Sequence, residues 1–308
     1  MEEIVITGIA GFRFGNAENR EAGTGCTVIL SEAGAVCGVD VRGGSPGTRD
    51  TDALSPLAAR KVVHAVLLTG GSAFGLAAAD GVTRFLEERR IGRDVGVTVV
   101  PNVCAAVLFD LKPGKPRPDA AMGYAACEAA FRKDAFLAGQ AGAGTGATIG
   151  KARGLEYCSK GGLGWAAFRT GGLCAGAVAA VNSIGDIVKE GRVIAGTHDR
   201  DGNFLNAEDI ILANYAEHRD FFSGQTEGTN TTLVCIVTNA RLDKAGATRL
   251  AGAGHDGIAR VIRPAHLQYD GDTVFALASG EVAATPDAVG ILARRAVEAA
   301  IINSVNAP

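Results

Sequence analysis

The sequence predicts a layered α/β fold in which two packed β-sheets lie between outer helices, an αββα sandwich. Three observations support this prediction. Short β-type runs alternate with glycine turns in the first third of the chain, strand and helix patterns then mix without strict βαβ repetition, and no internal repeat is present. With 308 residues, 47% of them hydrophobic, residues 1–308 can form one large domain around a substantial core.

In the first half, the hydrophobic pattern predicts short strands at CTVIL, AVCGVDV and VVHAVLLTG. A helix is expected in SAFGLAAADGVTRFLEERR, with Ser72 as its N-cap and Gly92 just past its end. We expect a strand at VGVTVV and a helix over residues 119–133. AGAGTGATIGKARG and SKGGLGWA are expected to be glycine loops around a short strand.

In the second half, GLCAGAVAAVNSIGDIV predicts a long strand or strand pair, and NAEDIILANYAEHRDFF a helix followed by the turn-prone segment SGQTEGTN. Strands are expected at TTLVCIVTNA and TVFALAS, with a helix in LDKAGATRLAGAGHDGIARVI between them. The last helix has a clear start, because Thr285 is a suitable N-cap and Pro286 suits the first helical position.

Composition argues against several classes of function. A net charge of −3 without a Lys/Arg cluster does not favour nucleic-acid binding. No apolar window reaches the roughly 18 residues of a membrane span, and the amino terminus does not resemble a signal peptide. The seven cysteines are scattered without CxxC spacing, which favours reduced thiols in a cytoplasmic protein. The five histidines show no zinc-ligand spacing, so we expect neither a metal nor an organic cofactor.

Three glycine-containing motifs fail on inspection. GAGTGATIGK is not a phosphate-binding loop, because Thr145 replaces its first glycine and Ala152 follows the lysine. LLTGGSAFG lacks the second glycine of a serine-hydrolase elbow, since Phe74 stands there. THDRDGN lacks the spacing of an EF-hand and is expected to be a turn.

The segment EGTNTTLVCIV is the most informative for chemistry, because a polar stretch runs directly into two threonines that open an apolar strand. Threonine is common in strands, so these residues also have a purely structural interpretation. In the functional interpretation, cleavage before Thr231 frees an α-amino group with a pKa near 8. That amine can accept the proton of the same residue's hydroxyl, so nucleophile and base are one residue.

Such a nucleophile needs an oxyanion donor and acidic groups that orient it. Asn182, at the end of the apolar run AAVN, is a candidate donor. Asp270 and Asp272, in DGD just before another apolar strand, are candidate acidic groups. Asp-Gly is also strong turn chemistry, so a β-turn remains the alternative for this segment.

At these residues the sequence resembles the L-aminopeptidase/D-esterase family, which includes β-peptidyl aminopeptidases and nylon-oligomer hydrolases. The resemblance covers nearly the whole chain and rests on these segments in order: AGTGCTVIL, GVDVRGGSPGTRDTD, LLTGGSAFGLAAADGV, GTGATIGK, KGGLG, AVNSIGD, GTNTTL and DGDTVFALASG. It implies the αββα fold of N-terminal-nucleophile hydrolases. It also implies self-cleavage between Asn230 and Thr231 into chains of residues 1–230 and 231–308.

The resemblance also implies roles for single residues. Asn182 matches the oxyanion-hole asparagine, and Asp270 and Asp272 match the acidic pair of the nylon-oligomer branch. The aminopeptidase branch carries a serine and a glutamate near here instead. Ser279 and Glu281 have that S-x-E spacing, but they lie too far beyond the nucleophile, and we interpret them as the end of a strand.

Two further positions are expected to contact substrate. Lys151 or Lys160 matches a lysine near the family's site, and the sequence does not decide between them. Phe109 stands where relatives are expected to carry tyrosine, so no hydroxyl is available there.

The expected function is hydrolysis of short peptides, amino-acyl amides or ω-amino acid oligomers through an acyl-enzyme, by a homo-oligomer of four or more copies. Two alternatives stay open: an acyltransferase of the ornithine acetyltransferase type, and a non-catalytic binding protein on the same scaffold.

Overall fold

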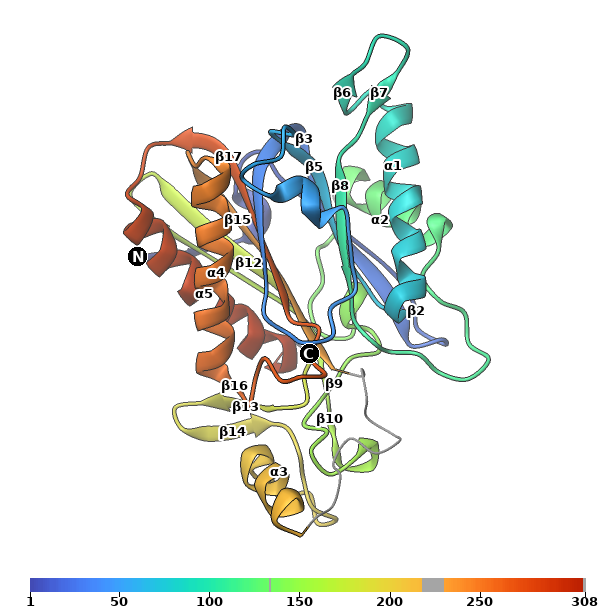
Figure 1. Cartoon of the computed structure of the whole chain (residues 1–308), viewed down its shortest axis with the longest axis vertical. Helices are drawn as coiled ribbons and strands as arrows, with labels where there is room; N and C mark the ends of the chain where they lie inside the picture. Colours follow the sequence, from blue (N-terminus) through green and yellow to red (C-terminus); the bar gives the residue numbers. More distant parts are fainter. Residues whose placement is uncertain (133, 218–229, 307–308) are drawn as a thin grey trace.

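A computed structural model describes residues 1–132, 134–217 and 230–306 of the chain. Its centre is a ten-stranded sheet in the order β1-β11-β12-β15-β17-β3-β5-β8-β4, with β2 paired to β3 (Figure 1). The strands of this sheet are β1 (Glu2–Ile4), β2 (Arg13–Asn19), β3 (Thr24–Val41), β4 (Thr48–Arg49), β5 (Val63–Thr69), β8 (Val103–Val107), β11 (Gly162–Thr170), β12 (Leu173–Asn182), β15 (Thr231–Ala240) and β17 (Thr273–Val282).

Five α-helices and several short strands complete the described fold. The helices are α1 (Ala78–Glu88), α2 (Ala120–Arg132), α3 (Ala207–Ala216), α4 (Lys244–Val261) and α5 (Pro286–Asn306). The short strands are β6 (Arg93–Asp94), β7 (Val99–Val100), β9 (Thr148–Ile149), β10 (Ser159–Lys160), β13 (Asp186–Lys189), β14 (Arg192–Ala195) and β16 (Ile262–Arg263). No helix in the described ranges is long and apolar enough to cross a bilayer.

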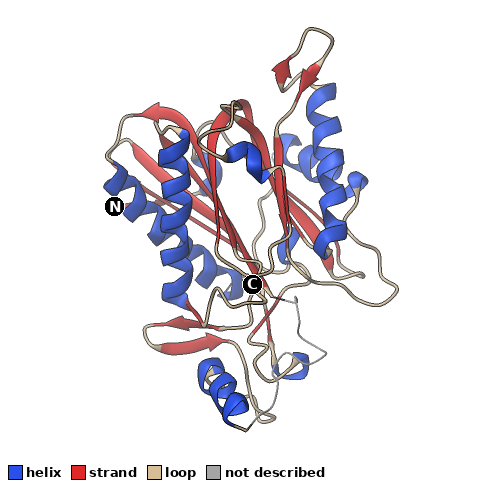
Figure 2. Ribbon diagram, in the orientation of Figure 1, coloured by secondary structure: helices blue, strands red, loops and turns tan. Residues whose placement is uncertain are grey.

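The long strand β3 divides the ten strands into two packed sheets. Its first half pairs with β2 and β5, its second half pairs with β17, and the register with β5 shifts between Leu30 and Ala35. Helices α4 and α5 cover one outer face, and α1 and α2 cover the other (Figure 2).

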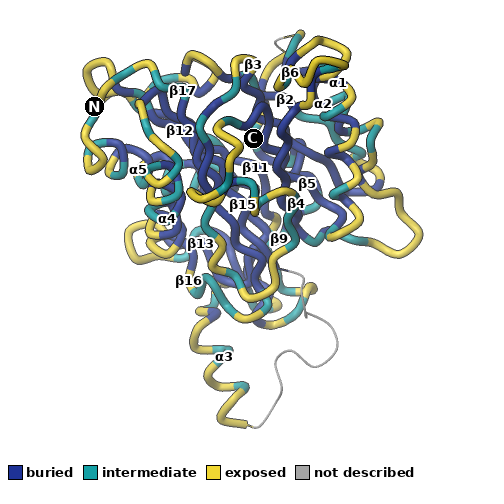
Figure 3. The backbone as a smooth tube through the Cα atoms, turned by 45° about the horizontal axis from the view of Figure 1, so that its top comes forward, coloured by how far each residue is buried: buried dark blue, intermediate teal, exposed yellow. Residues whose placement is uncertain are grey.

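Three hydrophobic layers fill this arrangement. The layer between the sheets contains Phe14, Leu68 and Phe275 from different strands. The second layer joins one sheet to α4 and α5, and the third joins the other sheet to α1 and α2. Three apolar layers separate four layers of secondary structure, which confirms the predicted αββα sandwich. Figure 3 shows the buried strands at the centre and α3 as an exposed projection.

Strand β15 shows why the sequence folds in this way. Leu233, Cys235 and Val237 face the layer between the sheets, whereas Val234 and Ile236 face α4 and α5. Because both faces are covered, the strand is a continuous apolar run. Neighbouring β17 runs parallel to it, and β12 runs antiparallel on its other side.

Several local predictions are confirmed in the described residues. GLCAGAVAAVNSIGDIV forms the pair β12 and β13, and TTLVCIVTNA and TVFALAS lie in β15 and β17. The helices over residues 119–133, in LDKAGATRLAGAGHDGIARVI and after Thr285 correspond to α2, α4 and α5. The helix predicted at NAEDIILANYAEHRDFF is present as α3. The end of that prediction and most of the turn predicted after it fall on residues 218–229, which lie outside the described residues.

Three local predictions differ from the structure. CTVIL and AVCGVDV are strands as predicted, but both belong to the single strand β3, which crosses from one sheet to the other. SKGGLGWA is not a loop but leads into β11, whose glycines let α5 approach closely: a Cβ on Gly164 would lie 1.9 Å from the Ala300 carbonyl. VGVTVV is a strand only over β7.

Ser72 is not an N-cap. Its backbone has φ = +51°, its hydroxyl makes no capping bond, and the segment begins as a 3₁₀ helix over Ser72–Ala77 before α1. An N-cap residue needs an extended backbone, which the tight turn at Gly70–Gly71 does not provide here.

Candidate active site

Strand pairing brings Thr231 and Asn182 together. Thr231 is the first residue of β15, Asn182 is the last of β12, and the two are directly opposite in the antiparallel register. Directly opposite residues project from the same face of a sheet, and both are buried. The Thr231 hydroxyl also donates a hydrogen bond to the carbonyl oxygen of Asn230. A hydroxyl and an amide therefore lie beside the peptide bond that joins residues 230 and 231.

The segment Asp270–Asp272 lies against the same point from the other side. Asn230 and Asp270 form a parallel β-bridge, and the amide of Gly271 donates to the Asn230 carbonyl at 3.0 Å. Oδ1 of Asp272 accepts a hydrogen bond of 2.6 Å from the amide of Thr232. The segment thus extends the pairing between β15 and β17. An isolated β-turn, the alternative interpretation of DGD, does not describe it fully.

Glycine at position 271 is required by this packing. A Cβ atom there would lie only 2.6 Å from the Thr231 hydroxyl oxygen and 3.1 Å from the carbonyl of Ser45. Contacts below 3.0 Å force neighbouring atoms to move, so any larger residue would displace the Thr231 hydroxyl.

Asn182 is held by two segments that are distant from it in sequence, one with Thr148 and Lys151 and one with Phe109. Its side-chain oxygen accepts bonds from the Thr148 amide at 2.9 Å and from Lys151 Nζ at 3.0 Å. Its amide nitrogen donates to the carbonyl of Phe109 at 3.0 Å. Lys151 Nζ also donates to the Asn182 backbone carbonyl at 2.8 Å. The side-chain amide is therefore fixed in one orientation, as an oxyanion donor requires.

The structure places each of the other predicted site residues. Lys151 is 1% exposed and contacts Asn182, whereas Lys160 is exposed on β10, so Lys151 is the lysine at this position. Phe109 contributes its backbone carbonyl. Ser279 and Glu281 lie in β17, beyond the part that pairs with the start of β15, in agreement with their interpretation as a strand end.

Two groups at the site have strongly shifted acidities. Burial, together with the negative charge of Asp272, raises the pKa of the Asp270 carboxyl to about 7. Burial also lowers the pKa of the Lys151 ammonium to about 7, although the charges of Cys158 and Asp270 favour its protonated form. Desolvation thus outweighs the attraction between these two groups. Both can exchange protons near neutral pH, which is typical of a catalytic centre.

His266 is a site residue that the sequence did not reveal. Its Nδ1 lies 2.8 Å from Oδ2 of Asp272. The spacing of the five histidines from one another bears only on a zinc site. The position of His266 six residues before Asp272 gives no recognisable motif, and the fold alone brings the two side chains together.

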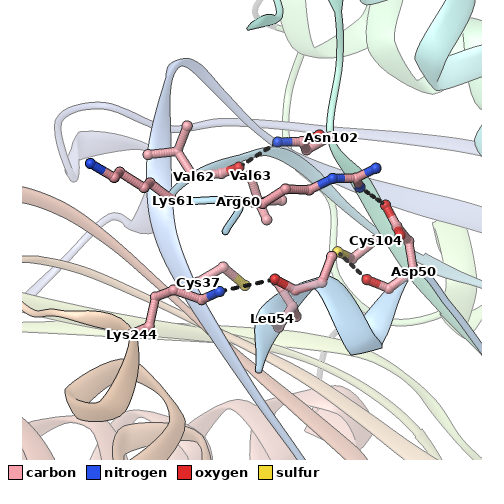
Figure 4. A pocket seen from close by; sticks show the side chains of 11 residues that line it. Cys37, Asp50, Leu54, Arg60, Lys61, Val62, Val63, Asn102, Cys104 and Lys244 are labelled. Atoms are coloured by element: carbon pink, nitrogen blue, oxygen red, sulfur yellow. Dashed lines mark hydrogen bonds and ion pairs between the residues drawn. The ribbon is translucent and has the colours of Figure 1, made fainter. Parts of the chain in front are cut away.

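A separate pocket involves none of these side chains. Figure 4 shows it between β3, β8 and the start of α4, lined in part by Cys37, Leu54, Cys104 and Lys244. Its volume of about 10 Å³ is about the space that a single water molecule requires. It is too small to bind a substrate.

Comparisons with known proteins show which sequences and folds this chain resembles. Residues 5–307 match peptidase family S58. An uncharacterized aminopeptidase of Mycobacterium tuberculosis (strain H37Rv) is 42% identical over 98% of this chain and 89% of its own. A 6-aminohexanoate-oligomer endohydrolase of Paenarthrobacter ureafaciens is 34% identical over 88% of this chain and 74% of its own.

Two solved structures share the fold over 97% of this chain and 85% of their own. One is the L-aminopeptidase D-Ala-esterase/amidase of Ochrobactrum anthropi, described as a variant of the Ntn hydrolase fold (TM-score 0.71, 19% identity). The other is a β-aminopeptidase of Burkholderia sp. (TM-score 0.69, 22% identity).

Proposed function

The chain belongs to peptidase family S58 and is a hydrolase, and we propose that it cleaves itself before Thr231 and then uses Thr231 as its nucleophile. One observation carries this proposal: the Thr231 hydroxyl contacts the carbonyl of the preceding residue while Asn182 and the Asp270–Asp272 segment lie on either side. The structural interpretation of Thr231 as an ordinary strand residue does not account for this convergence of buried polar groups.

In the first stage, the Thr231 hydroxyl oxygen attacks the carbonyl carbon of Asn230. The C–N bond breaks as the nitrogen takes up the hydroxyl proton and leaves as the free α-amine of Thr231, and Asn230 is held as an ester. Water then hydrolyses the ester, which yields the carboxylate of Asn230 and restores the hydroxyl. Residues 1–230 and 231–308 stay packed together, since β15 is paired on both sides with strands of the central sheet.

In the second stage, the new amine accepts the hydroxyl proton of Thr231 as the oxygen attacks a substrate carbonyl. The amide nitrogen of Asn182 stabilises the oxyanion, and its fixed orientation avoids reorganisation during the reaction. The leaving amine takes up the proton held by the α-ammonium of Thr231 and departs. Water then hydrolyses the acyl-enzyme ester, which restores the Thr231 hydroxyl. Asp270 and Asp272 orient the start of β15, and Lys151 holds Asn182 in place.

The proposed substrates are short peptides, amino-acyl amides and ω-amino acid oligomers. Similarity to the 6-aminohexanoate-oligomer endohydrolase and the Asp270–Asp272 pair support the oligomers, and similarity to aminopeptidases supports the peptides. The backbone carbonyl of Phe109 accepts a hydrogen bond from Asn182, and its side chain has no hydroxyl. The Phe109 side chain is therefore proposed to make only apolar contacts with a substrate. We propose a cytoplasmic homo-oligomer of four or more copies as the active form.

Intact-protein mass spectrometry tests the nucleophile. The wild type is expected to give two fragments that break between Asn230 and Thr231, and Thr231→Ala is expected to stay whole and inactive. Thr232→Ala is the matched control, because its hydroxyl lies one residue along the strand, and it should still be cleaved before position 231. A wild-type protein that hydrolyses amides while remaining one chain would refute the proposal.

A further inference from the structure

His266 is tied to Asp272 by two hydrogen bonds. The backbone amide of His266 donates to Asp272 Oδ2 at 3.1 Å, and its Nδ1 lies 2.8 Å from the same oxygen. When Asp272 is ionised its oxygens only accept, and Nδ1 then carries the proton in this contact. The His266 backbone has φ = +62°, and this left-handed conformation lets amide and ring reach the same oxygen.

A second histidine packs against the His266 ring. His255, buried in α4, contacts the His266 ring edge-to-face with centroids 4.7 Å apart. The Nε2 of His255 lies 3.0 Å from the Asp40 carbonyl, which holds that ring in turn. The orientation of His266 is therefore set by α4 and by the end of β3.

The two aspartate side chains differ in how many hydrogen bonds they accept. Asp272 accepts from the amides of Thr232 and His266 and from the His266 ring. Asp270 accepts one bond, from the Leu267 amide at 2.7 Å, and its other oxygen is buried without a partner among the described residues. Burial and the negative charge of Asp272 oppose ionisation of Asp270, so the pair favours a state in which one of the two carboxyls is protonated. The carboxylate with more donors retains its charge, and the other holds the proton.

We propose that His266 is a positioning residue that keeps Asp272 ionised, so that the proton shared by the acidic pair resides on Asp270. This inference rests on the proposed function of Thr231. It assigns different tasks to the two carboxyls: charged Asp272 fixes the Thr232 amide and hence the start of β15, and neutral Asp270 is a proton donor next to the reacting bond.

The charged groups around His266 agree with this assignment. Burial lowers the pKa of His266, but the hydrogen bond and negative charge of Asp272 outweigh it and raise the pKa above its ordinary value. His255 faces it from α4, where burial lowers the pKa of His255, and the positive charge of Arg42 opposes protonation of His266 from the end of β3. On the far side of the pair, Lys151 faces Asp270.

The test compares His266→Asn with His266→Ala. The Asn side-chain nitrogen can take the place of Nδ1 without its charge, and Asn tolerates the left-handed backbone. His64→Gln is the matched control, because His64 lies in β5 outside the site, and the Gln side-chain oxygen can still accept the bond from the Asn102 amide. Each purified variant is followed for self-cleavage and for kcat/KM between pH 5 and 9, with circular dichroism to verify the fold.

We expect His266→Ala to lower kcat/KM at the optimum about tenfold or more and to shift the acidic limb of the profile upward by about one pH unit, because the pair then ionises less readily. His266→Asn should recover most of the rate but keep part of the shift, and His64→Gln should stay within a few-fold of wild type. A merely structural His266 would lower the rate equally at every pH, and an acidic limb that stays unchanged in both His266 variants overturns the proposal.

If His266→Ala does not fold, His266→Asn against wild type carries the test, and an unshifted acidic limb again overturns the inference. Should neither variant fold, the imidazole ¹⁵N resonances of the wild-type protein provide the test. If they show that the His266 Nδ1 is not protonated, the proposal is overturned. Thr231→Ala in the same assay separates the two proposals. If it remains fully active, the proposed nucleophile is wrong. If it is inactive while both His266 variants behave as wild type, only the role of His266 is wrong.

Discussion

Thr231 and Asn182 are register partners at the ends of adjacent antiparallel strands in the central sheet. This relationship places a hydroxyl and an amide on one face without any loop between them. A shift of one residue in the β12–β15 register would send one of the two side chains to the opposite face. The apolar residues of both strands prevent such a shift, because it would also turn either Leu233 of β15 or Val178 of β12 out of the layer between the sheets.

Asn182 provides a sharp test of the oxyanion donor. Asn182→Asp keeps oxygen acceptors for the Thr148 amide and Lys151 but removes the N–H donor. We expect both Asn182→Asp and Asn182→Ala to lower kcat by about a hundredfold or more, as measured with an amino-acyl amide. Asn303→Ala, which removes a hydrogen bond from α5 to the Trp165 carbonyl, is the control. Wild-type turnover in Asn182→Asp would show that the oxyanion is stabilised elsewhere.

Gly271→Ala tests the close contact with the nucleophile. A Cβ 2.6 Å from the Thr231 hydroxyl oxygen is expected to displace it and to slow self-cleavage at least about tenfold. Cleavage is followed by gel electrophoresis after expression and by mass. Gly290→Ala in α5 is the matched control, since its Cβ would meet nothing within 4 Å, and alanine there should stabilise the helix by about 0.5–1 kcal/mol. Normal cleavage in Gly271→Ala would contradict the described geometry.

The raised pKa of Asp270 predicts how the stability of the folded chain depends on pH. Its pKa is about 7 in the folded chain and near 3.8 when unfolded, so between these values the folded state binds more protons. Stability is therefore lost as the pH rises from about 4 to 7. Asp270→Asn, compared in a Thr231→Ala background that stays uncleaved, should remove this loss and be more stable at pH 8 by on the order of 1 kcal/mol or more.

Thermal unfolding at pH 5 and pH 8 measures this difference, which corresponds to at least about 2 °C in Tm. The gain should be present at pH 8 and much smaller at pH 5. An equal effect at both values would mean that Asp270 ionises normally in the folded chain.

The main strands and helices could be predicted because their patterns are local. The runs that became β12, β15 and β17 are apolar over about ten residues each, and the start of α5 is marked by Thr285 and Pro286. Ser72 was misjudged because a capping residue and a left-handed turn residue look alike in sequence. The continuity of β3 escaped prediction because a strand shared by two sheets has an interruption, at residues 31–34, that resembles a turn.

The sequence by itself determined the layered fold and the positions of Thr231, Asn182, Asp270 and Asp272 at the ends of apolar runs, because burial and strand propensity act along the chain. Only the tertiary structure decided that Lys151 and not Lys160 holds Asn182, that Phe109 acts through its carbonyl, and that His266 contacts Asp272. These contacts depend on strand order and register, which sum over many pairings between distant segments. Such contacts cannot be recognised from the residues next to each position in the sequence.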